Sequence, residues 1–260
     1  MRTLIYDLEI SPMLGWAYEM WDARILHVER EPHIMAVGYK WLGEDGSAHC
    51  LTQPDFEDAY KRDPYSDARL VMHLWDLMDQ ADIVVAHNAR KFDNRVAQAR
   101  FLLNDMVPPS PFKTVDTLQA ARRFFRFGSN SLNDLCKKLE IGQKPETTHA
   151  KLWHKCLGGD MEAWEKMRDY CKNDVELLED LYLRLQPYIT NHPNVTMFDS
   201  LTGCPTCGST KLQYRGIQHT NTLSYRRVHC QNCGAWSRER LSLKDDEGKT
   251  LRPEFVGVTG

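Results

Sequence analysis

The first ten residues place the strongest constraint on the fold, because they join a buried strand to two acidic side chains. In the opening run MRTLIYDLEI, residues 3–6 are apolar or β-branched on both faces, a pattern typical of a sheet covered on both sides. Side chains two apart in a strand point the same way, so Asp7 and Glu9 are expected to project together. Like charges side by side destabilise a sheet, and a cation between them would reverse that cost. For this pair alone, a solvated strand end is the simpler interpretation.

Strands and helices alternate after this segment. The spacing of apolar residues predicts strands over residues 33–42, 48–52, 83–86 and 113–115. It predicts helices over residues 67–78, 89–103, 131–138 and 160–187, and a further helix that begins at residue 117. An initial hairpin followed by this alternation predicts an α/β fold with helices on both faces of the sheet. Residues 11–31 are predicted to be irregular, and their Trp16, Tyr18 and Trp21 form either a core flap or a surface that stacks on nucleobases.

The charge is divided unevenly along the chain. Residues 201–260 carry 9 Lys and Arg against 5 Asp and Glu, whereas residues 1–200 carry 24 against 31. A basic tail on an acidic body suggests that the two parts of the chain have different functions. No apolar stretch approaches membrane-spanning length, and the N-terminus lacks the pattern of a signal peptide. The expectation is a cytoplasmic protein without a membrane partner, located in the host cytoplasm if the chain is viral.

Two cysteine pairs mark the basic tail as a metal-binding module. The sequences Cys204-Pro-Thr-Cys207 and Cys230-Gln-Asn-Cys233 are each followed by glycine and are separated by 22 residues. In a chain without secretory features, such pairs indicate metal ligands rather than disulfides. We predict a zinc ribbon with one structural Zn²⁺, since four thiolates leave no open position for catalysis.

These features predict three segments. Residues 1–188 form the α/β domain, residues 189–202 a linker, and residues 203–260 the zinc ribbon and a C-terminal tail. The arginines and aromatic residues of the ribbon are typical of nucleic-acid binding. Zinc ribbons also bind proteins, so a protein partner stays open.

Two further carboxylates stand where they could join Asp7 and Glu9. Asp93 follows the predicted strand 83–86 and lies near the start of a helix, where complementing the helix dipole is the ordinary role. Asp174 borders the apolar stripe of the last helix. A carboxylate in that position is costly unless it is paired or holds a metal.

Taken together, three motifs resemble those of the DEDD exonucleases. They are Asp7-x-Glu9, Asn88-x-x-x-Phe92-Asp93 and Tyr170-x-x-x-Asp174. That family has a ribonuclease H-like fold, with a mixed sheet flanked by helices, and includes the proofreading exonucleases of DNA polymerases. The last motif is similar to that of the tyrosine subclass, since the position of the histidine in the other subclass is Asp169 here. More loosely, the whole chain resembles bacteriophage-type exonuclease-like proteins that end in a zinc ribbon.

The resemblance implies a function and a set of roles. Asp7, Glu9, Asp93 and Asp174 would hold two Mg²⁺ or Mn²⁺ ions, and Tyr170 would orient the attacking water. The implied activity is 3′-5′ exonuclease hydrolysis of phosphodiester bonds, with single-stranded DNA favoured over RNA as the substrate. The alternatives are a structure-specific endonuclease or ribonuclease on the same fold, and a non-catalytic nucleic-acid-binding adaptor.

Candidate substrate-binding residues lie in two places. Asn88 belongs to the second motif and is expected to hold its loop or the terminal nucleotide. A run that interleaves cations with aromatic residues is expected either to grip a single strand or to divide between core and solvent; its candidates are Arg122, Arg123, Phe125 and Arg126. His87 is interpreted as a packed side chain, and Asp116 as a helix cap rather than a ligand.

Overall fold

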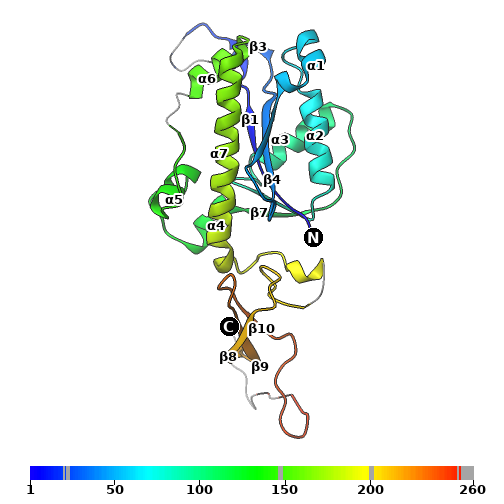
Figure 1. The fold of residues 1–260 in the computed structure, drawn as a ribbon, viewed down its shortest axis with the longest axis vertical. Helices are drawn as coiled ribbons and strands as arrows, with labels where there is room; N and C mark the ends of the chain where they lie inside the picture. Colours follow the sequence, from blue (N-terminus) through cyan, green and yellow to red (C-terminus); the bar gives the residue numbers. More distant parts are fainter. Residues whose placement is uncertain (20, 22–23, 146–148, 199–201, 251, 253–260) are drawn as a thin grey trace. The chain divides into compact units, whose positions relative to one another are not determined.

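A five-stranded mixed sheet forms the centre of residues Arg2–Tyr182 (Figure 1). The structure is a computed structural model that describes residues 1–19, 21, 24–145, 149–198, 202–250 and 252. It divides into two compact units, Arg2–Tyr182 and Leu183–Gly260. Residues 199–201 of the predicted linker, and 251 and 253–260 of the predicted tail, lie outside the described residues.

The order of the five strands is β5-β4-β1-β6-β7. The neighbours β1–β4 and β4–β5 are antiparallel, whereas β1–β6 and β6–β7 are parallel. The sheet consists of β1 (Thr3–Ile10), β4 (Ile34–Trp41), β5 (His49–Thr52), β6 (Ile83–Ala86) and β7 (Lys113–Asp116). The first strand lies in the middle, as expected for a strand that is apolar on both faces. The predicted mixed α/β architecture is therefore confirmed.

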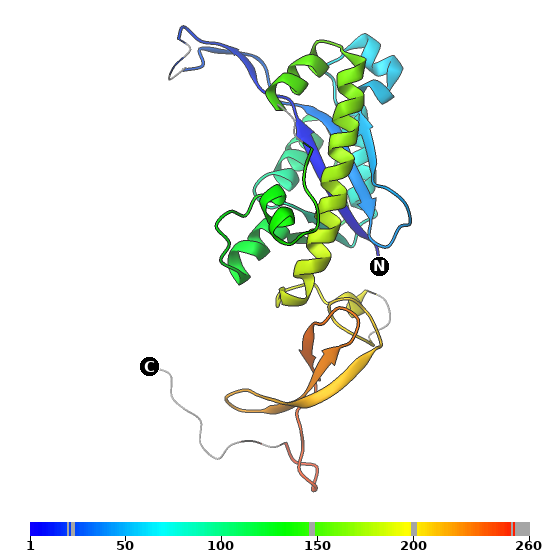
Figure 2. The same cartoon turned by 60° about the vertical axis from the view of Figure 1, so that its left-hand side comes forward.

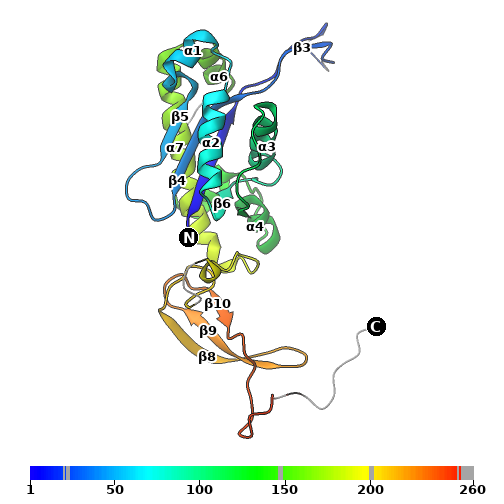
Figure 3. The ribbon, with the colours of Figure 1, turned by 90° about the vertical axis from the view of Figure 1, so that its right-hand side faces the viewer.

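Helices cover both faces of this sheet (Figure 3). On one face, α2 and α3 pack on a core that includes Leu4, Tyr6 and Leu8 of β1. On the other face, α7 packs with Trp164 and Met167 in a second core. The helices are α1 (Glu57–Arg62), α2 (Ala68–Asp79), α3 (Asp93–Leu103), α4 (Thr117–Phe124), α5 (Leu132–Lys138), α6 (His149–Leu157) and α7 (Met161–Leu185), with a short 3-10 turn η1 (Gln53–Asp55). None of the helices in the described parts of the chain combines the length and apolar character of a membrane span.

The register of β1 places its two acidic residues on the same face of the sheet. Asp7 pairs with Gly38 and Glu9 with Ala36, while Leu8 between them pairs with Val37 in the opposite core. Asp7 and Glu9 therefore face α7. The strand was predicted to end at residue 6, but it continues to Ile10, because Asp7 and Glu9 keep their pairing with β4.

Residues between β1 and β4 form a projecting hairpin rather than an irregular segment. Strands β2 (Leu14–Trp16) and β3 (His27–Arg30) pair with each other and extend away from the sheet (Figure 2). The side chains of Trp16, Tyr18 and Trp21 are 64%, 92% and 83% exposed. The core-flap interpretation of these three residues is therefore wrong.

The Leu183–Gly260 unit holds a smaller antiparallel sheet of order β10-β9-β8. Its strands are β8 (Leu212–His219), β9 (Ser224–Cys230) and β10 (Trp236–Arg238). They follow the 3-10 turns η2 (Gln186–Tyr188) and η3 (Val195–Met197). The hairpin predicted between the cysteine pairs is confirmed, and β10 adds a strand that the sequence pattern did not predict.

Gly38 allows α7 to lie close to the sheet. A β-carbon at this position would lie 2.7 Å from Cys171 Sγ and 2.9 Å from Val175 Cγ2. Both atoms belong to α7, and the Cys171 carbonyl oxygen would be only 3.0 Å away. Any side chain here would force the helix off the strand that carries Asp7.

We predict that Gly38→Ala lowers the free energy of unfolding by about 1–3 kcal/mol, the usual cost of overpacking a core. Urea unfolding followed by circular dichroism measures this change. Gly128→Ala is the matched control, because its nearest contact would be Lys138 Nζ at 3.8 Å. Equal stability of the two variants would contradict the close approach of α7.

Candidate active site

Asp7, which is partly buried, and Glu9, which is buried, form an acidic pair beside α7. Their carboxylate oxygens and Cys171 Sγ all lie within 4.8 Å of one another. Burial raises the pKa of Asp7 well above its ordinary value, and the charges of Asp93 and Asp174 raise it further. The pKa of Glu9 is raised in the same way by burial, Asp7 and Asp174. The site therefore concentrates negative charge where burial limits its screening by water.

Asp93 reaches this cluster from the first residue of α3. Its side chain is 2% exposed, and the backbone N–H of Leu8, between the two acidic residues of β1, donates to its carboxylate. Burial raises the pKa of Asp93 to about 7, against the N–H donors of Asp93 and Leu8. Its Oδ2 atom is buried and accepts no hydrogen bond among the described residues.

Asp174 joins the cluster from α7 and is bound by a lysine. Lys144 Nζ lies 2.5 Å from Asp174 Oδ2 and donates to the Tyr170 hydroxyl at 3.0 Å. Burial opposes the charge of Lys144, but the Asp174 carboxylate outweighs it and raises the lysine pKa. The charge of Lys144 also lowers the pKa of Asp7 and Glu9. A protein cation thus partly neutralises the acidic cluster.

Tyr170 lies one turn before Asp174 on α7 and is buried. Burial, together with the Asp174 charge, raises the pKa of its hydroxyl. The ring meets the Trp153 ring edge-on, with centroids 6.1 Å apart. A tyrosine in this environment stays protonated at neutral pH, which suits positioning rather than proton abstraction.

The donor set suits a hard divalent cation. Carboxylate oxygens are the preferred ligands of Mg²⁺ and Mn²⁺. The buried oxygen of Asp93 without a hydrogen bond, and the raised pKa values of Asp7 and Glu9, are the features that a bound cation would satisfy. The residues present therefore fit such an ion.

A polar cavity of about 490 Å³ adjoins the acidic cluster. Its lining includes Asp7, Asn88, Arg122 and Lys144. Asn88 does not cap α3, because the helix begins only at Asp93. Instead Asn88 has a φ of 78° and begins the turn that leads to the helix. Asn88 and Arg122 are thus in reach of the cluster.

The other residues of the cation–aromatic run lie elsewhere. Arg123, Phe125 and Arg126 are not among the lining residues of this cavity. Phe125 stacks on Phe127 at a centroid distance of 5.4 Å, and the guanidinium of Arg123 lies over Phe124.

His87 and Asp116 support the loop of the second motif. The ring nitrogens of His87 meet Thr117 Oγ1 at 2.9 Å and the Asn130 carbonyl oxygen at 3.0 Å, and burial lowers its pKa. Asp116 accepts from the Asn88 N–H and from the Gln119 N–H at the start of α4. His87 is therefore packed and neutral, and Asp116 is confirmed as a helix cap.

A second cavity, of about 890 Å³, is mainly apolar. Its lining includes Ile10, Phe92 and Trp153. Ile10 and Phe92 directly neighbour two of the acidic residues in the sequence, and Trp153 Nε1 donates to the Ile10 carbonyl oxygen at 2.9 Å. The acidic cluster thus borders the polar cavity through Asp7, and sequence neighbours of Glu9 and Asp93 line the apolar cavity.

Three neighbours of the cluster were not predicted from the sequence. Lys144 and Trp153 belong to no motif and reach the cluster only through the fold. Cys171 lies on the buried apolar face of α7. Its proximity to Asp7 and Glu9 follows from the register at Gly38. An apolar helical stripe gives no signal of this kind.

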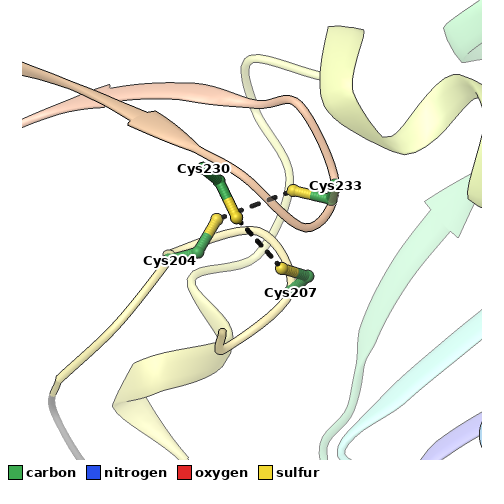
Figure 4. A group of neighbouring side chains, drawn as sticks. All are labelled: Cys204, Cys207, Cys230 and Cys233. Carbon is green, nitrogen blue, oxygen red and sulfur yellow. Dashed lines mark hydrogen bonds between the residues drawn. The ribbon is translucent and has the colours of Figure 1, made fainter. Parts of the chain in front are cut away.

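The four cysteines of the C-terminal unit converge on one point (Figure 4). Cys204 Sγ lies 3.7 Å from Cys233 Sγ, and Cys207 Sγ lies 3.7 Å from Cys230 Sγ. These distances exclude disulfides. Four sulfur atoms bound tetrahedrally to Zn²⁺ at about 2.3 Å would be about 3.8 Å apart. The arrangement is therefore compatible with a zinc ribbon.

The two cysteine pairs have the same local structure. The N–H of Gly208 donates to the Cys204 carbonyl oxygen, and the N–H of Gly234 donates to the Cys230 carbonyl oxygen. Both glycines have positive φ angles, of 76° and 81°, which a glycine adopts at little cost. Backbone N–H groups also point at the sulfur atoms of Cys204 and Cys230. Two matched turns thus present the thiols to one centre.

Comparisons with known proteins agree with this fold. A structure of the family B DNA polymerase from the hyperthermophilic archaeon Pyrobaculum calidifontis matches 72% of this chain, with a TM-score of 0.52 and 14% identity. The match covers 25% of the polymerase chain, and at this identity it shows the fold alone. A comparison with curated protein sequences found no match.

A family model gives the more specific result. The model described as RNase_H superfamily matches residues 32–186, a segment that includes the second and third motifs and more than half of the chain. With the mixed sheet and its covering helices, this match shows that the chain belongs to the RNase_H superfamily.

Proposed function

We propose that the Arg2–Tyr182 unit is a metal-dependent 3′-5′ exonuclease of the DEDD tyrosine subclass, acting on single-stranded DNA. The convergence of four carboxylates from three separate motifs is the observation that carries this proposal. Asp7 and Glu9 come from β1, Asp93 from α3 and Asp174 from α7. The charges of Asp93 and Asp174 raise the pKa of Asp7, and those of Asp7 and Asp174 raise the pKa of Glu9, which indicates that the carboxylates lie near one another. A purely structural cluster of this kind would only destabilise the fold.

The four carboxylates would hold two Mg²⁺ or Mn²⁺ ions. Such ions supply an activated water and stabilise the charge that develops on the leaving oxygen. The protein supplies orientation. The Tyr170 oxygen accepts from Lys144, which holds the hydroxyl in place, and Tyr170 would orient the attacking water. Hydrolysis at a 3′ end would release a nucleoside 5′-monophosphate.

The two cavities suit the two parts of a terminal nucleotide. The polar cavity offers Arg122 and Lys144 for phosphate oxygens, and Asn88 for a sugar or base edge. The apolar cavity offers Phe92, which is 44% exposed, and Trp153 for a base. A base in this cavity must be unpaired, which favours a single strand over a duplex.

We predict that Asp7→Asn and Asp174→Asn each reduce cleavage at least about a thousandfold, as expected when a group essential to the reaction is removed. The measurement is the ladder produced from a 5′-labelled oligonucleotide with Mg²⁺ or Mn²⁺. Asp169→Asn is the matched control, because Asp169 is an exposed carboxylate beside Tyr170 on the same helix. It should retain wild-type activity.

The urea unfolding of the variants distinguishes a loss of catalysis from misfolding. Without divalent cations, Asp7→Asn should unfold at a higher urea concentration than the wild type, since removing a like charge contributes up to about 1 kcal/mol. An unchanged ladder in both active-site variants would overturn the proposal. Cleavage of a circular single strand would replace it with an endonuclease, and stronger cleavage of RNA than of DNA with a ribonuclease.

We predict that Lys144→Ala destabilises the metal-free protein by about 1–3 kcal/mol, because Asp174 would lose the partner of a largely buried ion pair. Saturating Mg²⁺ or Mn²⁺ should reduce this loss, since the cation would replace the missing positive charge. Urea unfolding with and without the cation measures both values. Lys172→Ala, on α7 outside the cluster, is the control. A loss that cations leave unchanged would separate Lys144 from the metal site.

We further propose that the cysteine cluster binds one structural Zn²⁺. We predict one zinc per purified chain, and loss of that zinc in Cys207→Ser, because a serine hydroxyl is a much weaker zinc ligand than a thiolate. Elemental analysis after dialysis measures the stoichiometry. Cys136→Ser lies outside the cluster and should keep its zinc. Equal zinc content in both variants would refute the assignment.

A further inference from the structure

One face of the C-terminal sheet gathers cationic and aromatic side chains. Residues that pair across antiparallel strands share a face, and here Trp236 pairs with His229 while Arg238 pairs with Arg227. Arg215, from β8, reaches the same face, since its guanidinium lies 5.9 Å from the Trp236 ring. We call these five residues the basic face.

The exposed indole of Trp236 lies at the middle of the basic face. It is 50% exposed, and its ring stacks on His229 with centroids 4.5 Å apart and an interplanar angle of 29°. The Arg227 guanidinium lies 4.7 Å from the ring centroid. Arg238 lies 3.6 Å from the centroid of the Tyr225 ring. Planar groups and positive charges thus alternate within stacking distance of one another.

Carboxylates do not neutralise this face. In the described part of residues 202–250, the one ion pair joins Lys249 to Glu247. The nearest acidic residue along the strand, Glu239, hydrogen-bonds to Tyr214. Tyr214 pairs with Val228 and so belongs to the opposite face of the sheet. The arginines of the basic face are therefore available to an external anion.

This combination selects a single-stranded nucleic acid. Exposed aromatic rings and guanidinium planes stack on unpaired bases, and arginines contact the phosphates between them. The projecting β2–β3 hairpin offers a contrast. It also exposes aromatic residues, but residues 11–31 carry 4 acidic and 2 basic side chains, a charge that repels phosphate. Unlike this hairpin, the basic face joins aromatic exposure to positive charge.

We propose that the basic face is a second binding site for single-stranded nucleic acid, separate from the nuclease centre. Bases stack on Trp236, and Arg215, Arg227 and Arg238 contact phosphates. The proposal rests on the proposed nuclease function for its choice of a strand as the ligand. It assigns to the C-terminal unit the capture of the substrate, whereas the N-terminal unit cleaves it.

The test is fluorescence anisotropy of labelled single-stranded oligonucleotides of one sequence, as DNA and as RNA, with the full chain. Every protein also carries Asp7→Asn and is assayed without added Mg²⁺ or Mn²⁺, which prevents cleavage and leaves the zinc in place. Trp236→Leu, which keeps apolar bulk but removes the ring, should weaken binding about 5- to 100-fold. Trp236→Tyr should restore much of the affinity. Arg215→Ala should flatten the dependence of log affinity on log salt by about 0.7, the value for one phosphate contact on a single strand.

The opposite face provides matched controls. Tyr214 and Arg226 are also an aromatic ring and a guanidinium, 5.8 Å apart. Tyr214→Leu and Arg226→Ala should bind within about twofold of the wild type. The zinc content of every variant shows that the cysteine cluster is intact.

Two results would overturn the proposal. Unchanged affinity in Trp236→Leu and Arg215→Ala, with zinc retained, would leave this face to a protein partner. Equal losses in the Tyr214 and Arg226 variants would show that the strand does not bind selectively to the basic face. Cleavage of a trinucleotide tests the nuclease function separately. It should be abolished by Asp7→Asn and unaffected by Trp236→Leu, because so short a strand depends on the nuclease centre alone.

Discussion

The close packing of α7 on the central strands is the contact on which the active site depends. Gly38 has no side chain, so the helix can lie within van der Waals distance of the backbone beside β1. Because of this, carboxylates from a strand and from a helix meet in one buried layer. A helix displaced by the width of one methyl group would separate Asp174 from Asp7. The fold thus fixes the geometry of the cluster through a backbone contact, independently of the charges that it brings together.

The charges of these carboxylates destabilise the fold that brings them together. Burial and mutual repulsion raise the pKa values of Asp7, Glu9 and Asp93, so the ionised cluster lowers stability in the absence of a cation. Lys144 offsets part of this cost by its contact with Asp174. The C-terminal unit differs, because the core cluster at its cysteine pairs consists of Cys204, Cys230 and Ala235, with Cys207 and Cys233 among the partly buried residues packed against it. There a metal would supply the core that a small sheet lacks.

The sequence predicts the fold well where patterns are local. Apolar alternation located the strands of the main sheet, and the spacing of Asp7 and Glu9 correctly predicted a shared face. The start of α3 was placed too early, because residues 89–92 have helical composition but form a turn that begins at the left-handed Asn88. Lys144 escaped prediction for a different reason. A lysine in a loop has no periodicity, and its partner lies 30 residues away in the sequence.

Lys144 has a consequence for the segment that carries it. Its backbone N–H donates to Asn133 Oδ1 on α5, and its ammonium group reaches Asp174 on α7, so Lys144 links these two helices. The strength of the contact between Lys144 and Asp174 depends on how much negative charge the acidic cluster retains. A proton or a cation that lowers this charge would weaken the contact of Lys144 with α7. The attachment of Lys144 to α7 is therefore coupled to the charge of the acidic cluster.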